Sequence, residues 1–254
     1  MRDSRMAAAI LGVALLLAAT VPAHAAEIKV LSGNGSRGPV SELCAQFERA
    51  TGDKVDITFA VNPEVQRRIE GGEEFDVAIL NPPVLDELIK QGRIVAGTRA
   101  VIGRAGIGVA IGEHAPKPDI STVAAFKRTL LNAKSVAYPG DGASGKYFVS
   151  LVDRLGMTAE MKSRMRPMPG EYNVEVVATG EVDLVVVVAS RIAGVPGVQL
   201  AGLIPQELQT WIGFAGGAST RAKQPAAARA LLQFLTAPAA ATVLVKAGIE
   251  PFVE

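Results

Sequence analysis

The glycine pattern G-x-G-x-x-G occurs twice in this sequence, and each copy follows a short run that is typical of a β-strand. The first copy spans residues 33–38, after the apolar run 28–31. The second copy spans residues 140–145, after the run 135–138. Each copy opens a segment that we expect to be helical, so the order is strand, glycine turn and helix. The chain is therefore predicted to contain two α/β units.

The two units have a constant spacing. Gly33 and Gly140 lie 107 positions apart, and so do Asp76 and Asp183, each of which directly precedes an apolar strand-like run. Alternating strands and helices of this kind form parallel sheets that are flanked by helices. The alternative is coincidence in a glycine-rich chain, and residues 161–167 do not resemble their partner strand.

The glycine pattern is also the fingerprint of dinucleotide-binding folds, but two features argue against a nucleotide site. An NAD site requires an acidic residue at the far end of the second strand, whereas Asp56 lies near the beginning of strand 55–59. The second copy is not a P-loop either, because Tyr147 follows Lys146 where a Ser or Thr would bind magnesium. We expect the turns to hold a small anion instead, since a helix N-terminus carries about half a positive charge and unpaired N–H groups.

Residues 1–25 are predicted to be a secretory signal peptide. Arg2 and Arg5 precede an apolar stretch at 6–21, and residues 23–25 fit the small-x-small cleavage pattern. A membrane anchor is the alternative, but the stretch is short for a span and Pro22 follows it. We therefore expect export to the periplasm, where NAD and ATP are not available as working cofactors.

Composition argues against several other classes of protein. The 26 basic and 25 acidic residues are scattered, so no nucleic-acid surface is predicted. Cys44 is the only cysteine, and His114 is the only histidine beyond the predicted signal peptide. No disulfide, metal site or other cofactor is predicted from this set, and Ser36, Ser144 and Ser190 have no histidine nearby in sequence. Helical spacing with Val40, Leu43 and Phe47 predicts that Cys44 is buried.

The order and spacing of several segments resemble the periplasmic solute-binding proteins of ABC transporters, in particular their molybdate-binding branch. The segments that carry this resemblance are 28–33, 43–52, 75–80, 142–145, 155–156, 232–238 and 248–251. The resemblance implies the α/β type 2 periplasmic binding fold, with two lobes, mostly parallel sheets flanked by helices, and a ligand cleft between the lobes. Residues 26–103 plus 215–254 would form lobe 1, and residues 104–214 would form lobe 2.

The resemblance also implies a set of ligand-binding residues, because this family binds oxyanions with serine hydroxyls and backbone N–H groups at strand ends. Carried over to this sequence, the set is Asn34, Gly35, Ser36, Arg37, Asn62, Asn81, Ala143, Ser144, Gly145, Lys146 and Tyr147. Arg37 and Lys146 depart from the neutral molybdate sites of the family. Together with the asparagines and Tyr147 they suit a larger, carboxylate-bearing ligand. The alternatives are solvated positions for Arg37 and Lys146, turn positions for the asparagines, and core packing for Tyr147.

We therefore expect a non-enzymatic, monomeric binding protein that captures a small anion, either an oxyanion such as molybdate or a small organic acid. The resemblance implies that its lobes close like a hinged trap and that the closed form docks on the membrane permease of an ABC importer. The alternative is a secreted isomerase of the same fold that acts on a tricarboxylic acid, similar to aconitate isomerase. Such chemistry requires a general acid or base, for which Lys146, Tyr147 and Glu171 are the candidates.

Overall fold

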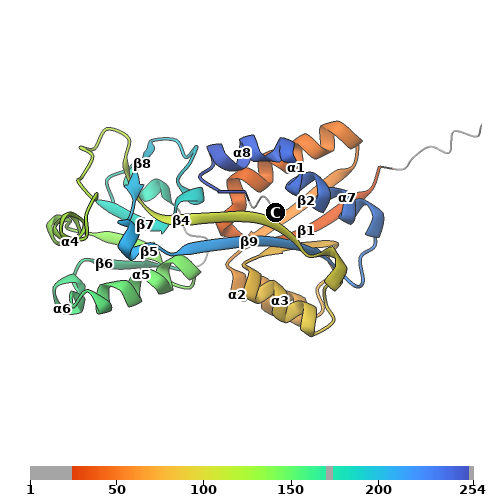
Figure 1. The fold of residues 1–254 in the computed structure, drawn as a ribbon, viewed down its shortest axis with the longest axis horizontal. Helices are drawn as coiled ribbons and strands as arrows, with labels where there is room; N and C mark the ends of the chain where they lie inside the picture. The colour runs from red at the N-terminus through yellow and green to blue at the C-terminus, as the bar shows by residue number, and fades with distance from the viewer. Residues whose placement is uncertain (1–24, 170–173, 252–254) are drawn as a thin grey trace, which may run out of the picture.

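Two groups of strands and helices are joined by two long strands, β4 (Ala100–Gly112) and β9 (Trp211–Ala218), in the computed structural model (Figure 1). The structure describes residues 25–169 and 174–251. Residues 1–24 of the predicted signal peptide and Glu171 therefore lie outside the described residues. We call the two groups the first and second halves. The lobe boundaries at 103/104 and 214/215 fall inside β4 and β9 and remain a prediction.

Nine strands of the described residues form one sheet. Eight of them follow the order β2-β1-β3-β9-β4-β7-β5-β6, and β8 pairs with β4. The other seven strands are β1 (Glu27–Gly33), β2 (Lys54–Ala60), β3 (Val77–Leu80), β5 (Val136–Pro139), β6 (Met165–Met168), β7 (Leu184–Val188) and β8 (Val198–Leu203).

The sheet contains one arrangement twice. In the first half β1 lies between β2 and β3, and all three strands are parallel. In the second half β5 lies between β6 and β7, again in parallel. A crossing strand then adds to each trio in antiparallel orientation, β9 to β3 and β4 to β7. The structure thus has two α/β units, as the glycine turns predict, and β6 supplies the counterpart of β2 that the sequence pattern did not reveal.

Helices follow the carboxyl ends of the parallel strands and cover the sheet (Figure 1). The helices are α1 (Arg37–Thr51), α2 (Asn62–Glu70), α3 (Pro82–Lys90), α4 (Val123–Asn132), α5 (Ala143–Arg154), α6 (Thr158–Met161), α7 (Pro225–Thr236) and α8 (Ala241–Lys246). Those that matter most for the site are α1, α2 and α3, which follow β1, β2 and β3, and α5, which follows β5. The C-terminal helices α7 and α8 return to the first half and pack against α1.

The largest cluster of buried apolar side chains joins both halves. It combines Val40 and Phe47 of α1 with Val187 of β7 and Leu231 of α7. Phe47 also meets Phe234 edge to face, with ring centroids 5.6 Å apart. Burying such a side chain contributes about 1.5–3 kcal/mol, so this cluster holds the two halves together.

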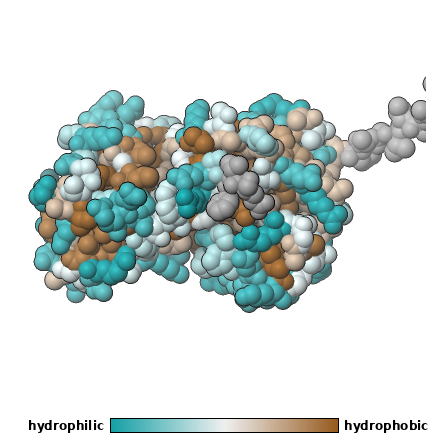
Figure 2. All heavy atoms as spheres, viewed as in Figure 1, coloured by the Kyte–Doolittle hydropathy of each residue, from teal (hydrophilic) through white to brown (hydrophobic). Residues whose placement is uncertain are grey.

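No single helix in the described part of the chain is long and apolar enough to cross a membrane. The bent pair Pro225–Thr236 and Pro238–Lys246 passes that test only as a pair, and its residues Leu231, Leu235 and Leu244 lie in the core. On the face shown in Figure 2, hydrophobic residues form separate patches among hydrophilic ones.

Cys44 is buried, as its helical spacing predicts, with 3% of its surface exposed. Burial, reinforced by the nearby carboxylate of Glu48, raises the pKa of its thiol to about 12. A thiol with this pKa stays protonated at neutral pH, and the reactive thiolate is absent. Cys44 is therefore a packing residue of α1.

The two aspartates of the repeat hold backbone groups near the beginnings of strands. The Asp76 carboxylate is 3% exposed and accepts the N–H groups of Lys29 and Gln224, both at 2.9 Å. The Asp183 carboxylate accepts the N–H of Lys134, just before β5, at 2.6 Å. Both residues thus hold neighbouring backbone segments in place.

Gly145 is required by the close approach of α5 to the end of β5, because a Cβ atom there would overlap the carbonyl oxygen of Pro139. We predict that Gly145→Ala lowers the free energy of unfolding by about 3 kcal/mol, as overpacking of a tight contact does. Gly38 of α1 is the matched control, because a Cβ atom there meets nothing within 4 Å. Gly38→Ala should change stability by less than about 1 kcal/mol, in the stabilising direction. Urea denaturation of both variants measures this, and equal effects would contradict the packing argument.

Candidate functional site

A cavity of about 60 Å³ lies between the two halves, at the carboxyl ends of β1, β2, β3, β5 and β7. Its lining residues are Asn34, Gly35, Val61, Asn62, Asn81, Pro139, Gly142, Ala143, Ser144, Val187, Val188, Arg191 and Ile212. Ligands of open α/β sheets bind at this edge, outside the carboxyl ends of the strands. The volume corresponds to roughly four to six water positions, which is the size of one small anionic group.

Four helices of the described chain begin at this cavity, because each follows a strand that ends there. Asn34 and Gly35 lie in the short 3-10 turn 34–36 that leads into α1, Asn62 opens α2, Asn81 precedes α3, and Ala143 opens α5. None of these helices has a side-chain hydrogen bond from its own N-cap residue. The N–H groups of Asn62, Ala143 and Ser144 make no hydrogen bond to another described residue and can bind a ligand, whereas α3 opens with Pro82 and Pro83, which have no N–H. The dipoles of all four helices favour a negative charge in the cavity.

The asparagine side chains at the cavity are held in fixed orientations. Asn62 Oδ1 accepts the backbone N–H of Asn81 at 2.8 Å, and Asn81 Nδ2 donates to the carbonyl of Gly213 at 2.8 Å. The Asn62 amide also occupies the space of a side chain at position 33, since a Cβ atom on Gly33 would lie 2.8 Å from Asn62 Nδ2. The first glycine turn is therefore needed for the close approach of this amide.

Ser144 is a buried polar side chain whose hydroxyl is unsatisfied within the described part of the chain. It lines the cavity, is only 5% exposed, and makes no hydrogen bond through its hydroxyl to any other described residue. An unsatisfied buried hydroxyl costs about 1–3 kcal/mol. Such a cost is expected where the missing partner is a ligand.

Arg191 supplies a positive charge at the cavity. It ends the short 3-10 turn η4 (Ala189–Arg191) after β7, and it is the one ionisable side chain among the described lining residues. The preceding Ser190 hydroxyl donates to the carbonyl of Gly35 at 2.6 Å, which fixes this turn against the first glycine turn. A guanidinium in such a place can form two parallel hydrogen bonds with a carboxylate.

The structure brings six of the predicted site residues together and places five outside the cavity. The six that line it are Asn34, Gly35, Asn62, Asn81, Ala143 and Ser144. The five that do not are Ser36, Arg37, Gly145, Lys146 and Tyr147. The members of this second group each have a structural reason for their position.

Ser36 is buried, and its hydroxyl donates to the carbonyl of Gly33 at 3.2 Å. Arg37 donates to Asn34 Oδ1 at 2.9 Å and lies over the ring of Phe59. Arg37 therefore orients a lining residue without lining the cavity itself.

In the second half, the Tyr147 hydroxyl donates to the carbonyl of Leu208 at 2.5 Å, and its ring packs against the core. Lys146 is exposed on the surface of α5. Gly145 serves the packing of α5 on β5. Among the described lining residues the positively charged one is Arg191, and the predicted Arg37 and Lys146 do not line the cavity.

Arg191 was not predicted, although the repeat contained a signal for it. An offset of 107 places Val188 of β7 opposite Asn81, which ends β3. The residues after β7 were therefore candidates by the same argument that selected Asn81. The apolar wall residues Val61, Val187 and Ile212 carried no sequence signal that separates them from core positions.

The sequence matches the family model for bacterial extracellular solute-binding proteins over residues 28–250. The chain belongs to this family. It is 37% identical to an aconitate isomerase from Pseudomonas sp. over 248 residues, which cover 94% of each chain. It is 28% identical to a molybdate-binding protein of Azotobacter vinelandii over 241 residues, which cover 92% of each chain.

The solved structure of the periplasmic molybdate-binding protein of A. vinelandii has the same fold. The two superpose with a TM-score of 0.74 at 18% identity, covering 89% of this chain and 100% of that one. The predicted resemblance to the molybdate-binding branch and the predicted type 2 periplasmic binding fold are therefore confirmed.

We predict that Ser144→Ala does not destabilise the ligand-free protein and raises the free energy of unfolding by about 0.5–1 kcal/mol, because it removes an unsatisfied buried hydroxyl. Ser36→Ala is the matched control, since it removes a buried hydroxyl that is hydrogen-bonded. That variant should lose about 1 kcal/mol. Guanidinium chloride denaturation compares the two, and an equal loss in both would show that the Ser144 hydroxyl has a partner within the protein.

Proposed function

We propose that this protein is exported to the periplasm, holds a small carboxylate-bearing anion between its lobes, and delivers it to the membrane permease of an ABC importer. The observation that carries the proposal is that four helices begin at one cavity, which Arg191 also lines. Membership of the solute-binding family supports the role in transport. The predicted signal peptide supports export.

A carboxylate is favoured over a tetrahedral oxyanion by the charge at the cavity. The planar fork of Arg191 matches two carboxylate oxygens, and the asparagine amides add neutral donors. The relationship to an aconitate isomerase supports a tricarboxylic acid as the ligand. The cavity of about 60 Å³ accommodates one carboxylate group. The rest of such an acid would need space made by opening the lobes about β4 and β9.

A second candidate function is isomerisation of a tricarboxylic acid, which the 37% identity to an aconitate isomerase over 94% of both chains favours. Migration of a double bond needs a group that removes a proton from one carbon and returns it to another. Of the predicted candidates, Lys146 and Tyr147 do not line the cavity. Glu171 lies outside the described residues and is therefore the residue to test.

We predict that trans-aconitate or citrate, at about a hundred times its Kd, stabilises the mature protein by about 2.7 kcal/mol, a shift of several degrees in Tm. Arg191→Gln should abolish this shift, because it removes the paired donors for a carboxylate. Arg49→Gln is the matched control, since Arg49 lies exposed in the last turn of α1. Thermal unfolding with a panel that includes molybdate, sulfate and phosphate measures this. A shift with molybdate alone would contradict a carboxylate ligand.

Proton NMR of cis- and trans-aconitate, incubated with the protein, separates the receptor from the isomerase. A receptor leaves each isomer unchanged at stoichiometric protein, whereas an isomerase brings both to one equilibrium mixture. If turnover is observed, we expect Glu171→Gln to reduce kcat at least a hundredfold, the range of general acid–base catalysis. Glu160→Gln on α6 is the control, and equal turnover by the two variants would exclude Glu171 as the acid or base.

A further inference from the structure

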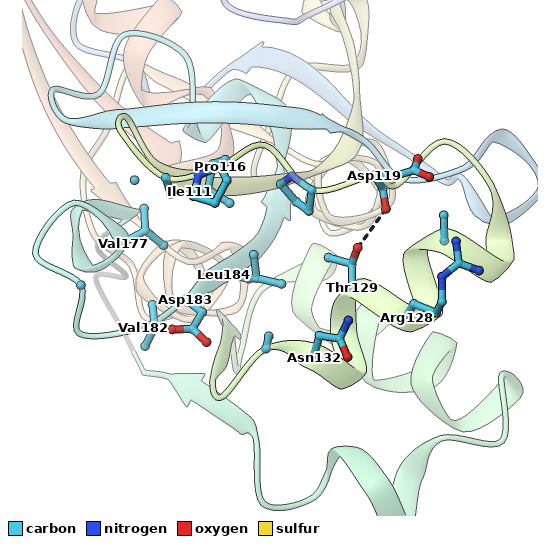
Figure 3. A pocket seen from close by; sticks show the side chains of 16 residues that line it. Ile111, Pro116, Asp119, Arg128, Thr129, Asn132, Val177, Val182, Asp183 and Leu184 are labelled. Atoms are coloured by element: carbon cyan, nitrogen blue, oxygen red, sulfur yellow. Dashed lines mark hydrogen bonds between the residues drawn. The ribbon is translucent and has the colours of Figure 1, made fainter.

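A second and larger cavity, of about 640 Å³, lies in the second half of the molecule (Figure 3). It is open to solvent on one side and is bounded by the end of β4, the loop that follows it, α4, and the segment that leads into β7. Leu184, the first residue of β7, lines this cavity. Val187 and Val188 at the other end of β7 line the cavity of about 60 Å³ between the two halves, which we call the anion cavity after its proposed ligand. The two cavities therefore lie at opposite ends of one strand and are separate.

The interior of the second cavity is apolar. Ile111, Val177, Val182 and Leu184 point into it in Figure 3, and each is at most 7% exposed. Small-molecule sites have volumes of about 300–1,000 Å³ and mostly apolar linings with a few polar groups. This cavity falls within that range and has that kind of lining.

The loop 112–119 after β4 forms the roof of the cavity, and hydrogen bonds hold it in place at both ends. Gln199 Nε2 donates to the carbonyls of Gly112 at 3.1 Å, Glu113 at 2.6 Å and Ala115 at 3.2 Å. At the far end, Thr129 Oγ1 of α4 donates to the carbonyl of Asp119 at 2.9 Å, the dashed line in Figure 3. The intervening prolines limit backbone freedom further. The cavity is thus preformed and does not depend on a ligand to shape it.

The charges at the two ends of the cavity differ. At one end Asp119 accepts the N–H and the hydroxyl of Ser121 at 3.0 and 2.7 Å, and these bonds, with the charge of Arg128, lower the pKa of Asp119. The carboxylate of Asp119 is therefore already stabilised by groups of the protein. At the other end one oxygen of Asp183 accepts the N–H of Lys134 at 2.6 Å, and the other has no hydrogen-bond partner among the described residues. The side-chain amide of Asn132, which also lines the cavity, has no hydrogen-bond partner among the described residues either.

We propose that this cavity binds a small apolar amine. Its hydrocarbon part packs against Ile111, Val177 and Leu184, and its ammonium group donates to the uncommitted oxygen of Asp183. Asn132 offers a further acceptor at the rim. This site is independent of the anion cavity and of the proposed transport function.

The proposal is tested with the full mature chain and three probes of the same shape: 2-phenylethylamine, 2-phenylethanol and phenylacetate. Titration calorimetry should show that the amine binds at least about tenfold more tightly than the alcohol and that phenylacetate does not bind. Asp183→Asn, which retains an acceptor for the Lys134 N–H, should weaken amine binding about tenfold. Glu181→Gln removes a nearby charge that does not line the cavity and should leave binding unchanged.

Ala115→Trp fills the cavity from its roof and should abolish amine binding, which gives a second test if Asp183→Asn does not fold. Arg191→Gln should leave amine binding unchanged, because Arg191 lines the other cavity. Equal binding of the alcohol or of phenylacetate, full binding by Asp183→Asn, or no amine binding at millimolar concentration would each overturn the proposal.

Discussion

The antiparallel pairing of β4 with β9 is the constraint on which the rest of the structure depends. Each of these strands also pairs with a parallel trio, β9 with β3 and β4 with β7, so the sheet continues from one half into the other. Two glycines allow neighbouring side chains to pack closely on β9. A Cβ atom on Gly216 would lie 2.5 Å from the Leu232 side chain, and one on Gly217 would lie 2.5 Å from the Ile94 side chain. Since the two trios are arranged symmetrically about this pair, strand ends from both halves meet at one cavity.

The chemistry of the anion cavity follows from this topology. Each helix that follows a parallel strand begins at the carboxyl end of that strand. The cavity at these strand ends is therefore surrounded by helix N-termini and their partial positive charge, whatever side chains line it. The side chains that line the cavity then determine which anion is preferred. Asn34 and Asn62 line the cavity and carry amide N–H groups, Ser144 carries a hydroxyl that has no hydrogen-bond partner among the described residues, and Arg191 carries a positive charge.

Local sequence patterns predicted those parts of the structure that local physics determines. The glycine turns, the helix that opens at Ala143 after the second turn, and the burial of Cys44 all follow from nearby residues. The strand β6 was harder to predict, because Met165–Met168 is a short, partly exposed edge strand that contains a proline. Side-chain direction was hardest, because it depends on partners far away in sequence: the hydroxyl acceptor of Tyr147 is Leu208. The repeat offset points only to the residues that follow β7, and Arg191 was singled out among them once the structure placed this turn beside the first glycine turn.

The central claim is that one anion is held by backbone N–H groups from both halves at once. Amide NMR of the ¹⁵N-labelled mature protein, titrated with trans-aconitate, tests it most directly. The account predicts that the amide signals of Gly35, Asn62 and Ser144 shift together and give one common Kd. Shifts confined to a single half, or to residues around the second cavity, would contradict it.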